Sequence, residues 1–203
     1  MTKVLLHAAM SLDGFIADAS DQVGPLHEWY YCGDTPLPEP SAQGFDHSGA
    51  TFKVSQVSAA YVRSVWARIG CIVMGRRLFD LVDGWSGRPP VGDHVVVVSH
   101  RPKPPGWHPE ASFHFVGDIA AAITMAKALA VGRDIAVNAG NVGSQVLKAG
   151  LVDEVALDVV PVIFGSGRPF FAGLEHQQLL EDPHVVIQGT RVLHLGFKVR
   201  GRA

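Results

Sequence analysis

Two adjacent arginines stand where a short apolar run ends, and residue types in this pattern could bind phosphate. Residues 71–74 are apolar, Gly75 follows them, and Arg76 and Arg77 open a stretch with helical spacing. A glycine allows backbone N–H groups to approach a ligand, the first turn of a helix leaves N–H groups unpaired, and arginine presents planar donors that match phosphate oxygens. The junction therefore predicts a phosphate-binding site. The alternative is an ordinary strand end with two solvated charges.

Two other predicted strand ends carry residues suited to the same ligand. One apolar run ends in Ser99 and is followed by His100 and Arg101, and a later run passes into a turn of small residues, 138–143. In open α/β sheets, ligands bind beyond the carboxyl ends of the strands, so we expect these junctions to meet. Cations and a hydroxyl suit a terminal phosphate, and the small turn can offer N–H groups to a pyrophosphate. The set predicts a site for a phosphorylated dinucleotide, although the sequence lacks the G-x-G-x-x-G fingerprint of the Rossmann fold.

The composition limits the class of protein. A length of 203 residues, 47% of them hydrophobic and 18% charged, is typical of one compact globular domain. A net charge of -2 predicts no general affinity for nucleic acid or for an anionic membrane surface. With no secretory signal, no run long enough to span a membrane and two cysteines far apart, we expect a cytoplasmic protein with two reduced thiols. The ten histidines show no metal-ligand spacing, so no metal site is predicted.

Strands and helices alternate along the predicted fold, which is typical of an α/β protein with a largely parallel sheet. Asp118 is expected to cap one helix, and the last two strands are expected to form an antiparallel hairpin at one edge of the sheet. Residues 18–53 carry many glycines and prolines and are expected to form a long loop. The expected strands are 4–10, 71–74, 94–99, 111–116, 135–137, 154–160, 185–187 and 192–199, and the expected helices are 57–69, 77–83, 119–130 and 144–149.

Four blocks of residues resemble the dihydrofolate reductase-like family. They are 9–17 (AMSLDGFIA), 73–76 (VMGR), 149–154 (AGLVDE) and 160–171 (VPVIFGSGRPFF), and the similarity runs from about residue 4 to residue 199. Within the family, the chain resembles the reductase domain of riboflavin biosynthesis, which is the C-terminal domain of a bifunctional deaminase-reductase, and its stand-alone relatives. The resemblance implies a single domain over residues 1–203. Its fold would have three layers, with a mostly parallel central sheet and antiparallel C-terminal strands.

The resemblance also implies a cofactor and the residues that bind it. The expected hydride donor is NADPH, the expected substrate is a small molecule, and relatives are commonly homodimers. Ala9 and Ile16 are expected near the nicotinamide. The adenosine phosphate is expected near Gly75, Arg76, Arg77, Ser99, His100 and Arg101, and the pyrophosphate near Asn138, Ala139, Gly140, Asn141, Val142 and Gly143.

Three positions depart from the pattern of the family. Riboflavin-pathway reductases place a lysine in the first strand, where this chain has His7, and a glutamate before the small turn, where it has Val137 or Asn138 depending on the register. The two adjacent glycines of the family fall on Asn138 and Ala139 or on Ala139 and Gly140, and a side chain there would narrow the cofactor cleft. The two missing polar groups argue against the riboflavin-pathway substrate.

Candidates for proton transfer and substrate binding lie at two places. Asp13 is beside the expected nicotinamide site and is a candidate proton donor, or else a part of a structural Asp-Gly turn. Trp29, within the aromatic and ionisable stretch 27–31, offers a stacking surface for a heterocycle, or else packs against the edge of the domain. Asp13 and Trp29 are therefore the predicted catalytic residues.

Together these features predict an NADPH-dependent reductase of a small, flat heterocycle or imine-like substrate, with residues 18–53 on the substrate side. One alternative is the 5-amino-6-(5-phosphoribosylamino)uracil reductase of riboflavin biosynthesis. Another is a nucleotide-binding or ligand-sensing protein that has the fold without hydride transfer. Binding and oxidation of NADPH separate these three hypotheses.

Overall fold

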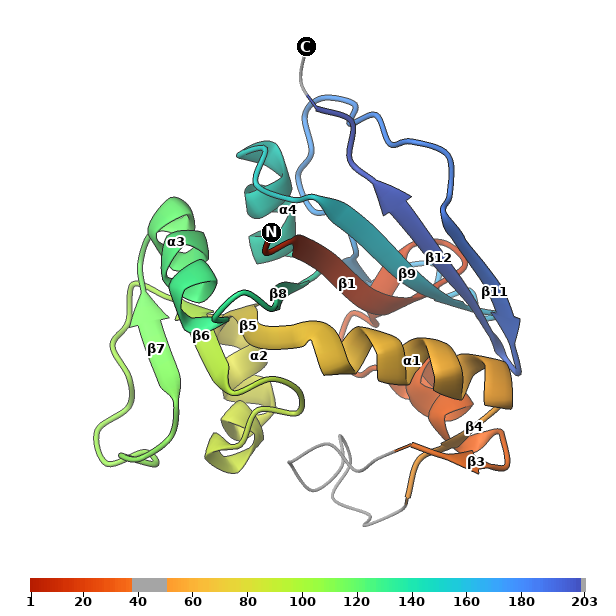
Figure 1. Ribbon diagram of the computed structural model, residues 1–203, viewed down its shortest axis with the longest axis horizontal. Coiled ribbons are helices and arrows are strands. Elements are labelled where there is room, and N and C mark those ends of the chain that lie inside the picture. Colours follow the sequence, from red (N-terminus) through yellow and green to blue (C-terminus); the bar gives the residue numbers. More distant parts are fainter. Residues whose placement is uncertain (38–50, 202–203) are drawn as a thin grey trace.

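An eight-stranded sheet forms the centre of the protein (Figure 1). The computed structural model describes residues 1–37 and 51–201. All neighbouring strands from β9 to β7 are parallel, whereas β12 is antiparallel to both β9 and β11. The predicted parallel sheet with an antiparallel C-terminal pair at one edge is therefore confirmed. In spatial order the strands are β11 (Val185–Gly189), β12 (Val192–Lys198), β9 (Glu154–Val160), β1 (Val4–Ser11), β8 (Asp134–Asn138), β5 (Ile69–Gly75), β6 (His94–Val98) and β7 (Phe113–Val116).

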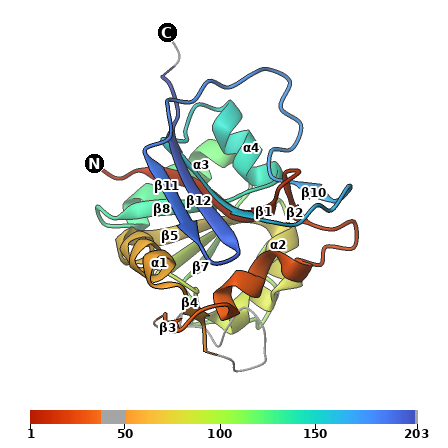
Figure 2. The ribbon, with the colours of Figure 1, turned by 90° about the vertical axis from the view of Figure 1, so that its right-hand side faces the viewer.

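Helices cover both faces of this sheet. α3 (Ile119–Leu129) and α4 (Asn141–Lys148) pack on one face around a large buried apolar cluster. α1 (Gln56–Arg68), α2 (Arg76–Leu81) and the 3-10 helix η1 (Gly24–Tyr31) pack on the other face, around two further clusters. Figures 1 and 2 show these two groups of helices on opposite sides of the strands. The predicted three-layer α/β fold is thus confirmed.

The segment 18–53 contains more regular structure than its glycines and prolines predict. η1 lies within it, and apolar side chains spaced three and four residues apart project from η1 into the core. This spacing is helical, but one short helix is too brief to show a repeat in the sequence. Residues 38–50 of the predicted loop lie outside the described residues. The buried side chains of η1 are Leu26, Trp29 and Tyr30.

Short elements that the sequence does not predict connect the larger ones. β3 (Thr35–Pro36) pairs with β4 (Lys53–Val54), and β2 (Phe15–Ala17) pairs with β10 (Arg168–Pro169). A 3-10 turn, η2 (Asp83–Gly87), follows α2. Elements of this length carry no periodicity, so hydrophobic patterning cannot indicate them.

Side-chain caps fix where two helices begin. Asp118 accepts a hydrogen bond from the backbone N–H of Ala121 at 2.8 Å, so the predicted cap of α3 is confirmed. Ser55 accepts from the backbone N–H of Ser58 at 3.4 Å and caps α1 in the same way. Each cap satisfies an N–H group that the helix itself leaves unpaired.

The two cysteines carry free thiols, as the sequence predicts. Cys71 is buried in β5, where desolvation raises the pKa of its thiol to about 12. Cys32 follows η1, and its Sγ donates to the backbone oxygen of Glu28 at 3.1 Å. Neither thiol is therefore part of a disulfide.

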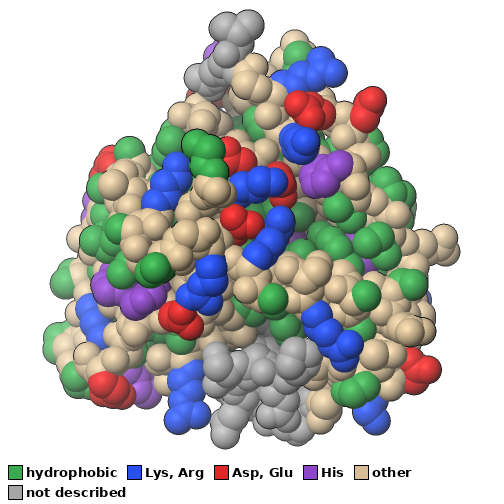
Figure 3. Space-filling model, viewed as in Figure 1, with side chains coloured by type: hydrophobic (Ala, Val, Ile, Leu, Met, Phe, Trp, Pro, Cys, Tyr) green, Lys and Arg blue, Asp and Glu red, His purple; other side chains and the backbone are tan. Residues whose placement is uncertain are grey.

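The surface carries charges of both signs. On the face shown in Figure 3, Lys and Arg side chains are interspersed with Asp and Glu, which agrees with the small net charge. Within residues 1–37 and 51–201, no helix combines the length and the apolar character that crossing a membrane requires.

Candidate functional site

The carboxyl ends of neighbouring strands bring the predicted cofactor-binding residues to one edge of the sheet. β1, β8, β5 and β6 lie side by side and parallel, so Gly75 and the turn that begins at Asn138 are at the same edge. A side-chain carbon on Gly75 would lie 3.0 Å from Cγ2 of Val142, which places the end of β5 against the first turn of α4. A carbon on Gly140 would lie 3.3 Å from Cδ1 of Ile16. Residues from separate parts of the chain therefore meet here.

Two glycines shape the first turn of α4 for different reasons. Gly140 adopts φ 88° and ψ -148°, a conformation that other residues rarely adopt. Gly143 is required by packing, because a side-chain carbon there would lie 2.4 Å from Cδ1 of Leu6. α4 consequently begins at Asn141, earlier than the helix predicted over 144–149. The first N–H groups of a helix lack partners within it, so this turn can offer donors to an anion.

Arg76 and Arg101 converge on one carboxylate at the same edge. Nε of Arg76 donates to Oδ1 of Asp80 at 2.7 Å, and Nη2 of Arg101 donates to Oδ2 at 2.8 Å. The guanidinium of Arg76 also lies 5.5 Å from the ring centre of Phe79. Oγ of Ser99 accepts the backbone N–H of Arg101 at 2.9 Å and fixes the chain after β6. Two guanidinium groups against one carboxylate leave a net positive charge, which suits a phosphate.

The remaining predicted cofactor residues are also at this edge and differ in exposure. Ala9 lies near the end of β1 and is half-buried, as is Ala139 in the turn between β8 and α4. His100 is exposed immediately after β6, and Asn141 is exposed at the start of α4. Oδ1 of Asn141 accepts a hydrogen bond from Gln145 at 2.7 Å. Of these four residues, His100 and Asn141 are thus open to solvent, and Ala9 and Ala139 are partly covered.

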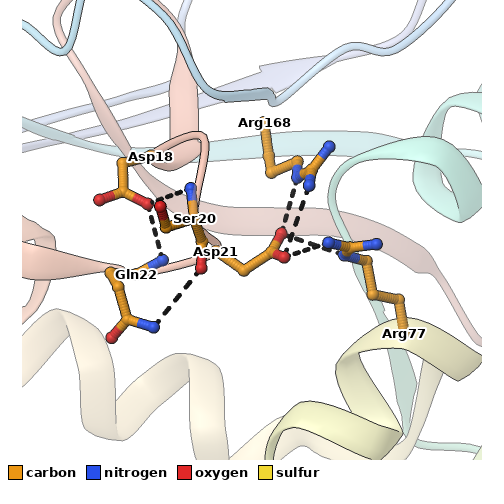
Figure 4. Close-up of polar contacts among 6 residues, drawn as sticks. All are labelled: Asp18, Ser20, Asp21, Gln22, Arg77 and Arg168. Atoms are coloured by element: carbon orange, nitrogen blue, oxygen red, sulfur yellow. Dashed lines mark hydrogen bonds and ion pairs between the residues drawn. The ribbon is translucent and has the colours of Figure 1, made fainter.

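Arg77, the second arginine of the predicted phosphate site, pairs with a carboxylate from another segment. Nε of Arg77 and Nε of Arg168 donate to Oδ1 of Asp21 at 3.0 Å and 2.6 Å (Figure 4). These hydrogen bonds hold the pKa of Asp21 well below its usual range. The hydrogen bond from Arg77 has the largest effect, and the one from Arg168 the next largest. We call the three residues the Asp21 ion cluster. Arg77 is therefore paired with the segment after β2, whereas Arg76 is paired with Asp80.

Asp13 has a different role from the one predicted. Its carboxylate accepts hydrogen bonds from Oγ of Ser11 at 2.6 Å and from the backbone N–H groups of Phe164 and Gly165 at 3.1 Å and 2.7 Å. The hydrogen bond from Ser11 contributes most to lowering the pKa of Asp13. A carboxylate that three donors hold in its ionised form is a poor proton donor. Asp13 therefore anchors the segment after β9 through its carboxylate.

Trp29 is also placed differently from the prediction. It is 1% exposed, its ring stacks on that of Tyr30 with 3.9 Å between centroids, and it meets His194 edge to face at 5.2 Å. Such a ring has no open face for a heterocycle. The sequence could not separate the two roles, because an aromatic side chain suits a binding surface and a core equally well. Trp29 is a core residue that covers His194.

Polar side chains on three neighbouring strands form a buried network outside the predicted site. Asp158 in β9 is 2% exposed and accepts hydrogen bonds from Nε2 of His7 in β1 at 2.9 Å and from Nδ1 of His194 in β12 at 2.6 Å. Nε2 of His194 lies 3.0 Å from Oγ of Ser58 in α1. We call His7, Asp158, His194 and Ser58 the histidine network. Its signal in the sequence is one polar residue in the middle of each of three apolar strands.

Electrostatic attraction outweighs desolvation within this network. Burial disfavours the charged form of both His7 and Asp158, but their proximity and hydrogen bond raise the pKa of His7 above 6.5 and lower the pKa of Asp158 below 3.8. Nearby, burial and then the charge of Asp158 raise the pKa of Tyr30 and that of Tyr61, so both phenols stay neutral. Up to the raised pKa of the imidazole, His7 and Asp158 therefore form an ion pair.

The histidine network reaches the edge of the sheet at His7. The side chain of His7 is 29% exposed, whereas those of Asp158 and His194 are 3% and 0% exposed. The register partner of His7 in β8 is Asn138, which leads into the turn before α4. Oδ1 of Asn138 is buried and has no hydrogen-bond partner among the described residues. A ligand at this point would meet the imidazole of His7.

A separate hollow of about 440 Å³ lies between α4, β9 and the segment 171–180. Its apolar lining residues are Leu147, Val155, Phe171, Leu174 and Leu180, and His176 is one of its polar lining residues. None of the residues that line it belongs to the predicted site or to the histidine network. It is therefore distinct from the edge where the strands end.

The fold, together with the strand ends at one edge, defines a protein of the dihydrofolate reductase-like class. Residues 2–196 match the family described as the RibD C-terminal domain. Because the match covers nearly the whole chain, the protein belongs to the RibD C-terminal domain family. No curated protein matches the sequence.

Solved structures share the fold. A candidate riboflavin biosynthesis protein from Shewanella sp. PV-4 is 23% identical, with a TM-score of 0.65, and the alignment covers 98% of this chain and 99% of that one. RibD from Acinetobacter baumannii, in two forms, is 18% and 16% identical with TM-scores of 0.61 and 0.55, and 98% of this chain is covered in both. The chain spans 58% of the length of the Acinetobacter protein. At these identities the likeness establishes the fold.

Proposed function

We propose that this protein is a reductase that uses NADPH to reduce a small heterocyclic or imine-like substrate. The observation that carries the proposal is the shared edge at the ends of β5, β6 and β8, where Arg76 and Arg101 lie beside the first turn of α4. When bound, NADPH supplies a hydride to the acceptor carbon of the substrate. Membership of the RibD C-terminal domain family supports the same activity.

The residues at this edge fit a phosphorylated dinucleotide. The first turn of α4, opened by Gly140, can donate backbone N–H groups to the pyrophosphate. Arg76 and Arg101, with one carboxylate between them, can bind the adenosine phosphate. We place the nicotinamide beside Ala9 at the end of β1 and Ile16 in β2, which lies against the turn before α4.

A narrower candidate is the 5-amino-6-(5-phosphoribosylamino)uracil reductase of riboflavin biosynthesis. The family match favours it, and so do solved structures that are named for this pathway. Two positions weigh against it: His7 stands where pathway reductases carry lysine, and the position of their glutamate is Val137 or Asn138, neither of which is acidic. His7 is instead paired with Asp158 on the neighbouring strand β9. We therefore propose the broader activity and treat the pathway substrate as one compound to be tested.

Fluorescence titration with NADPH and NADH, followed by NADPH oxidation with a panel of C=N heterocycles, tests the proposal. The panel includes the ribosylaminopyrimidine substrate of the riboflavin pathway. We expect NADPH to bind and to be oxidised in the presence of at least one heterocycle. Absence of nucleotide binding would refute the reductase, and binding without oxidation by any compound would indicate a nucleotide sensor. Light scattering of the same sample tests the proposed homodimer.

A further inference from the structure

His7 joins the histidine network to the edge where the cofactor is proposed to bind. It lies beside Asn138 at the end of β8, and it shares one face of β1 with Ala9, two residues further along the strand. Its side chain is partly exposed, whereas Asp158 and His194 are closed off from solvent. His7 is therefore the member of this network that a substrate can touch.

The hydrogen bonds determine which nitrogen of His7 is available to a ligand. Nε2 lies 2.9 Å from Oδ2 of Asp158 and donates to it. Among the described residues, Nδ1 has no hydrogen-bond partner. In the protonated ring, the Nδ1–H group is therefore the donor that a ligand can use.

The inner part of the network keeps Asp158 ionised and fixed. Oγ–H of Ser55 donates to Oγ of Ser58 at 3.0 Å, and Ser58 in turn donates to Nε2 of His194 at 3.0 Å. His194 then carries its proton on Nδ1 and donates it to Asp158 at 2.6 Å. This order of donors gives each group in the network a hydrogen-bond partner. The pKa of His7 is raised beside Asp158, which favours a positive charge on that ring.

We propose that His7 is a catalytic acid whose Nδ1–H group protonates the nitrogen of a C=N bond in the substrate, with Asp158 and His194 as positioning residues. The inference rests on the proposed function, because it assigns the proton donor and the acceptor class of the same site. A nitrogen acceptor is favoured because it takes the proton directly as the neighbouring carbon gains a hydride. The substrate class is thus a flat nitrogen heterocycle with a C=N bond.

The reduction balances with one hydride and one proton. The carbon of the C=N bond would gain the hydride that a bound NADPH would supply. The π electron pair forms the new N–H bond with the proton from Nδ1 of His7. His7 is left neutral, with its remaining proton on Nε2 still donated to Asp158. A proton from water restores Nδ1–H before the next turnover.

The charged and titratable groups around His7 suit an acid. Burial opposes a charge on the ring, but the carboxylate of Asp158 outweighs it and raises the pKa of His7 above 6.5. Tyr30 on η1 and Tyr61 on α1 also face Asp158, and the raised pKa of each phenol keeps it neutral. Across the described ranges, no group of three His, Cys, Asp or Glu side chains is arranged to hold a metal ion. Proton transfer is therefore the chemistry that this network supports.

Histidine NMR tests the acid without cofactor or substrate. In protein labelled at histidine, we expect the ring of His7 to titrate with a midpoint above 6.5 and to keep the proton on Nε2 when neutral. In Asp158→Asn the midpoint should fall, because the carboxylate that favours the imidazolium is gone. A midpoint at or below 6.5 in the wild type, or one that does not change in Asp158→Asn, overturns the proposal.

Two acceptors that differ by one methyl group test the proton transfer itself. Quinoxaline needs a proton on nitrogen as its carbon accepts a hydride, whereas N-methylquinoxalinium already carries the positive charge and needs none. With saturating NADPH, we expect His7→Gln to slow quinoxaline reduction on the order of 100-fold and to leave N-methylquinoxalinium reduction unchanged. His176→Gln, a change at an exposed histidine outside the site, is the matched control and should behave as the wild type with both acceptors.

The outcomes separate this inference from the proposed function. An equal loss with both acceptors would make His7 a structural or positioning residue and overturn the proposal. Wild-type protein that binds NADPH but reduces neither acceptor would also overturn it, while nucleotide binding stands. Failure of the wild type to bind NADPH would refute the proposed function and this inference with it. Glutamine can still donate to Asp158, so we expect His7→Gln to fold and to bind NADPH as the wild type does.

Discussion

Replacing Asp158 by asparagine tests the histidine network through the stability of the fold, independently of any activity. The carboxylate is 2% exposed and joins β1 to β12 through hydrogen bonds with His7 and His194. Asparagine has the same shape but no charge, and its NH₂ group would face one of two imidazoles that both donate. The substitution therefore replaces two charge-assisted hydrogen bonds by at most one neutral hydrogen bond.

The size of the effect follows from these bonds. A hydrogen bond to a charged group contributes about 1.5 to 3 kcal/mol, and a neutral one contributes about 1 kcal/mol. Part of the loss is offset because the buried charge no longer has to be desolvated. We expect Asp158→Asn to lower the free energy of unfolding by about 2 to 4 kcal/mol at pH 6.

The loss should also depend on pH with a defined sign. The folded protein raises the pKa of His7, so the stabilisation from its charge is fully present below the unfolded value of 6.5 and is lost as pH rises through the folded value. The pKa of Asp158 is lowered, so its contribution is present above 3.8 and is lost as pH falls through its folded value. The difference between wild type and Asp158→Asn should therefore be largest near pH 5 to 6 and smaller at pH 9.

Urea unfolding at pH 6 and pH 9, followed by tryptophan fluorescence, measures this difference. Asp182→Asn removes an exposed carboxylate and serves as the control, with an expected change within about 0.5 kcal/mol at both pH values. A loss below about 1 kcal/mol for Asp158→Asn at pH 6 would refute the buried ion pair, since a single charged hydrogen bond contributes more. An equal loss at both pH values would refute the assignment of the positive charge to His7.

Three further predictions concern the cofactor edge and the Asp21 ion cluster. Arg76→Ala should weaken NADPH binding more than NADH binding, by about 1 to 3 kcal/mol in fluorescence titrations, and an equal loss would place Arg76 away from the extra phosphate. Ala139→Gly should keep the thermal unfolding temperature close to that of the wild type without weakening NADPH binding, because the change only widens the cleft; a sharp loss of affinity contradicts this. Asp21→Asn should speed backbone hydrogen exchange around it, because the carboxylate no longer holds Arg77 and Arg168, and unchanged exchange would show that the ion cluster does not fix this segment.

The elements that could be predicted from the sequence are those with a local signal. β5 and β6 are unbroken apolar runs because helices cover both faces of the sheet, so their composition alone indicates buried strands. Asp118 caps α3 through a side chain three residues from its partner, which is a contact that the sequence shows directly. The sequence also predicted that Gly75 and the turn after β8 lie close together, because parallel strands end at the same edge of the sheet.

The parts of the site that could not be predicted depend on which strands become neighbours. His7 and Asp158 are 151 residues apart, and they meet only because β1 lies beside β9. His194 joins them because β12 lies on the other side of β9. Local patterning marks each of the three as a polar residue in an apolar strand, but it cannot pair them. The same limit applies to Arg77, since its partner Asp21 lies on a segment whose position the local sequence does not determine.

The stretch of chain after β2, residues 18–31 with η1 included, contacts both parts of the candidate site. Asp21, near its start, pairs with Arg77, which adjoins Arg76 at the cofactor edge. Trp29, near its end, covers His194 and so keeps water from the inner part of the histidine network. A phosphate bound at the edge would compete with Asp21 for the guanidinium of Arg77. The contact of Asp21 with Arg77 and the contact of Trp29 with His194 are made by one short stretch of chain. We therefore expect cofactor binding to shift the ring of Trp29 relative to His194.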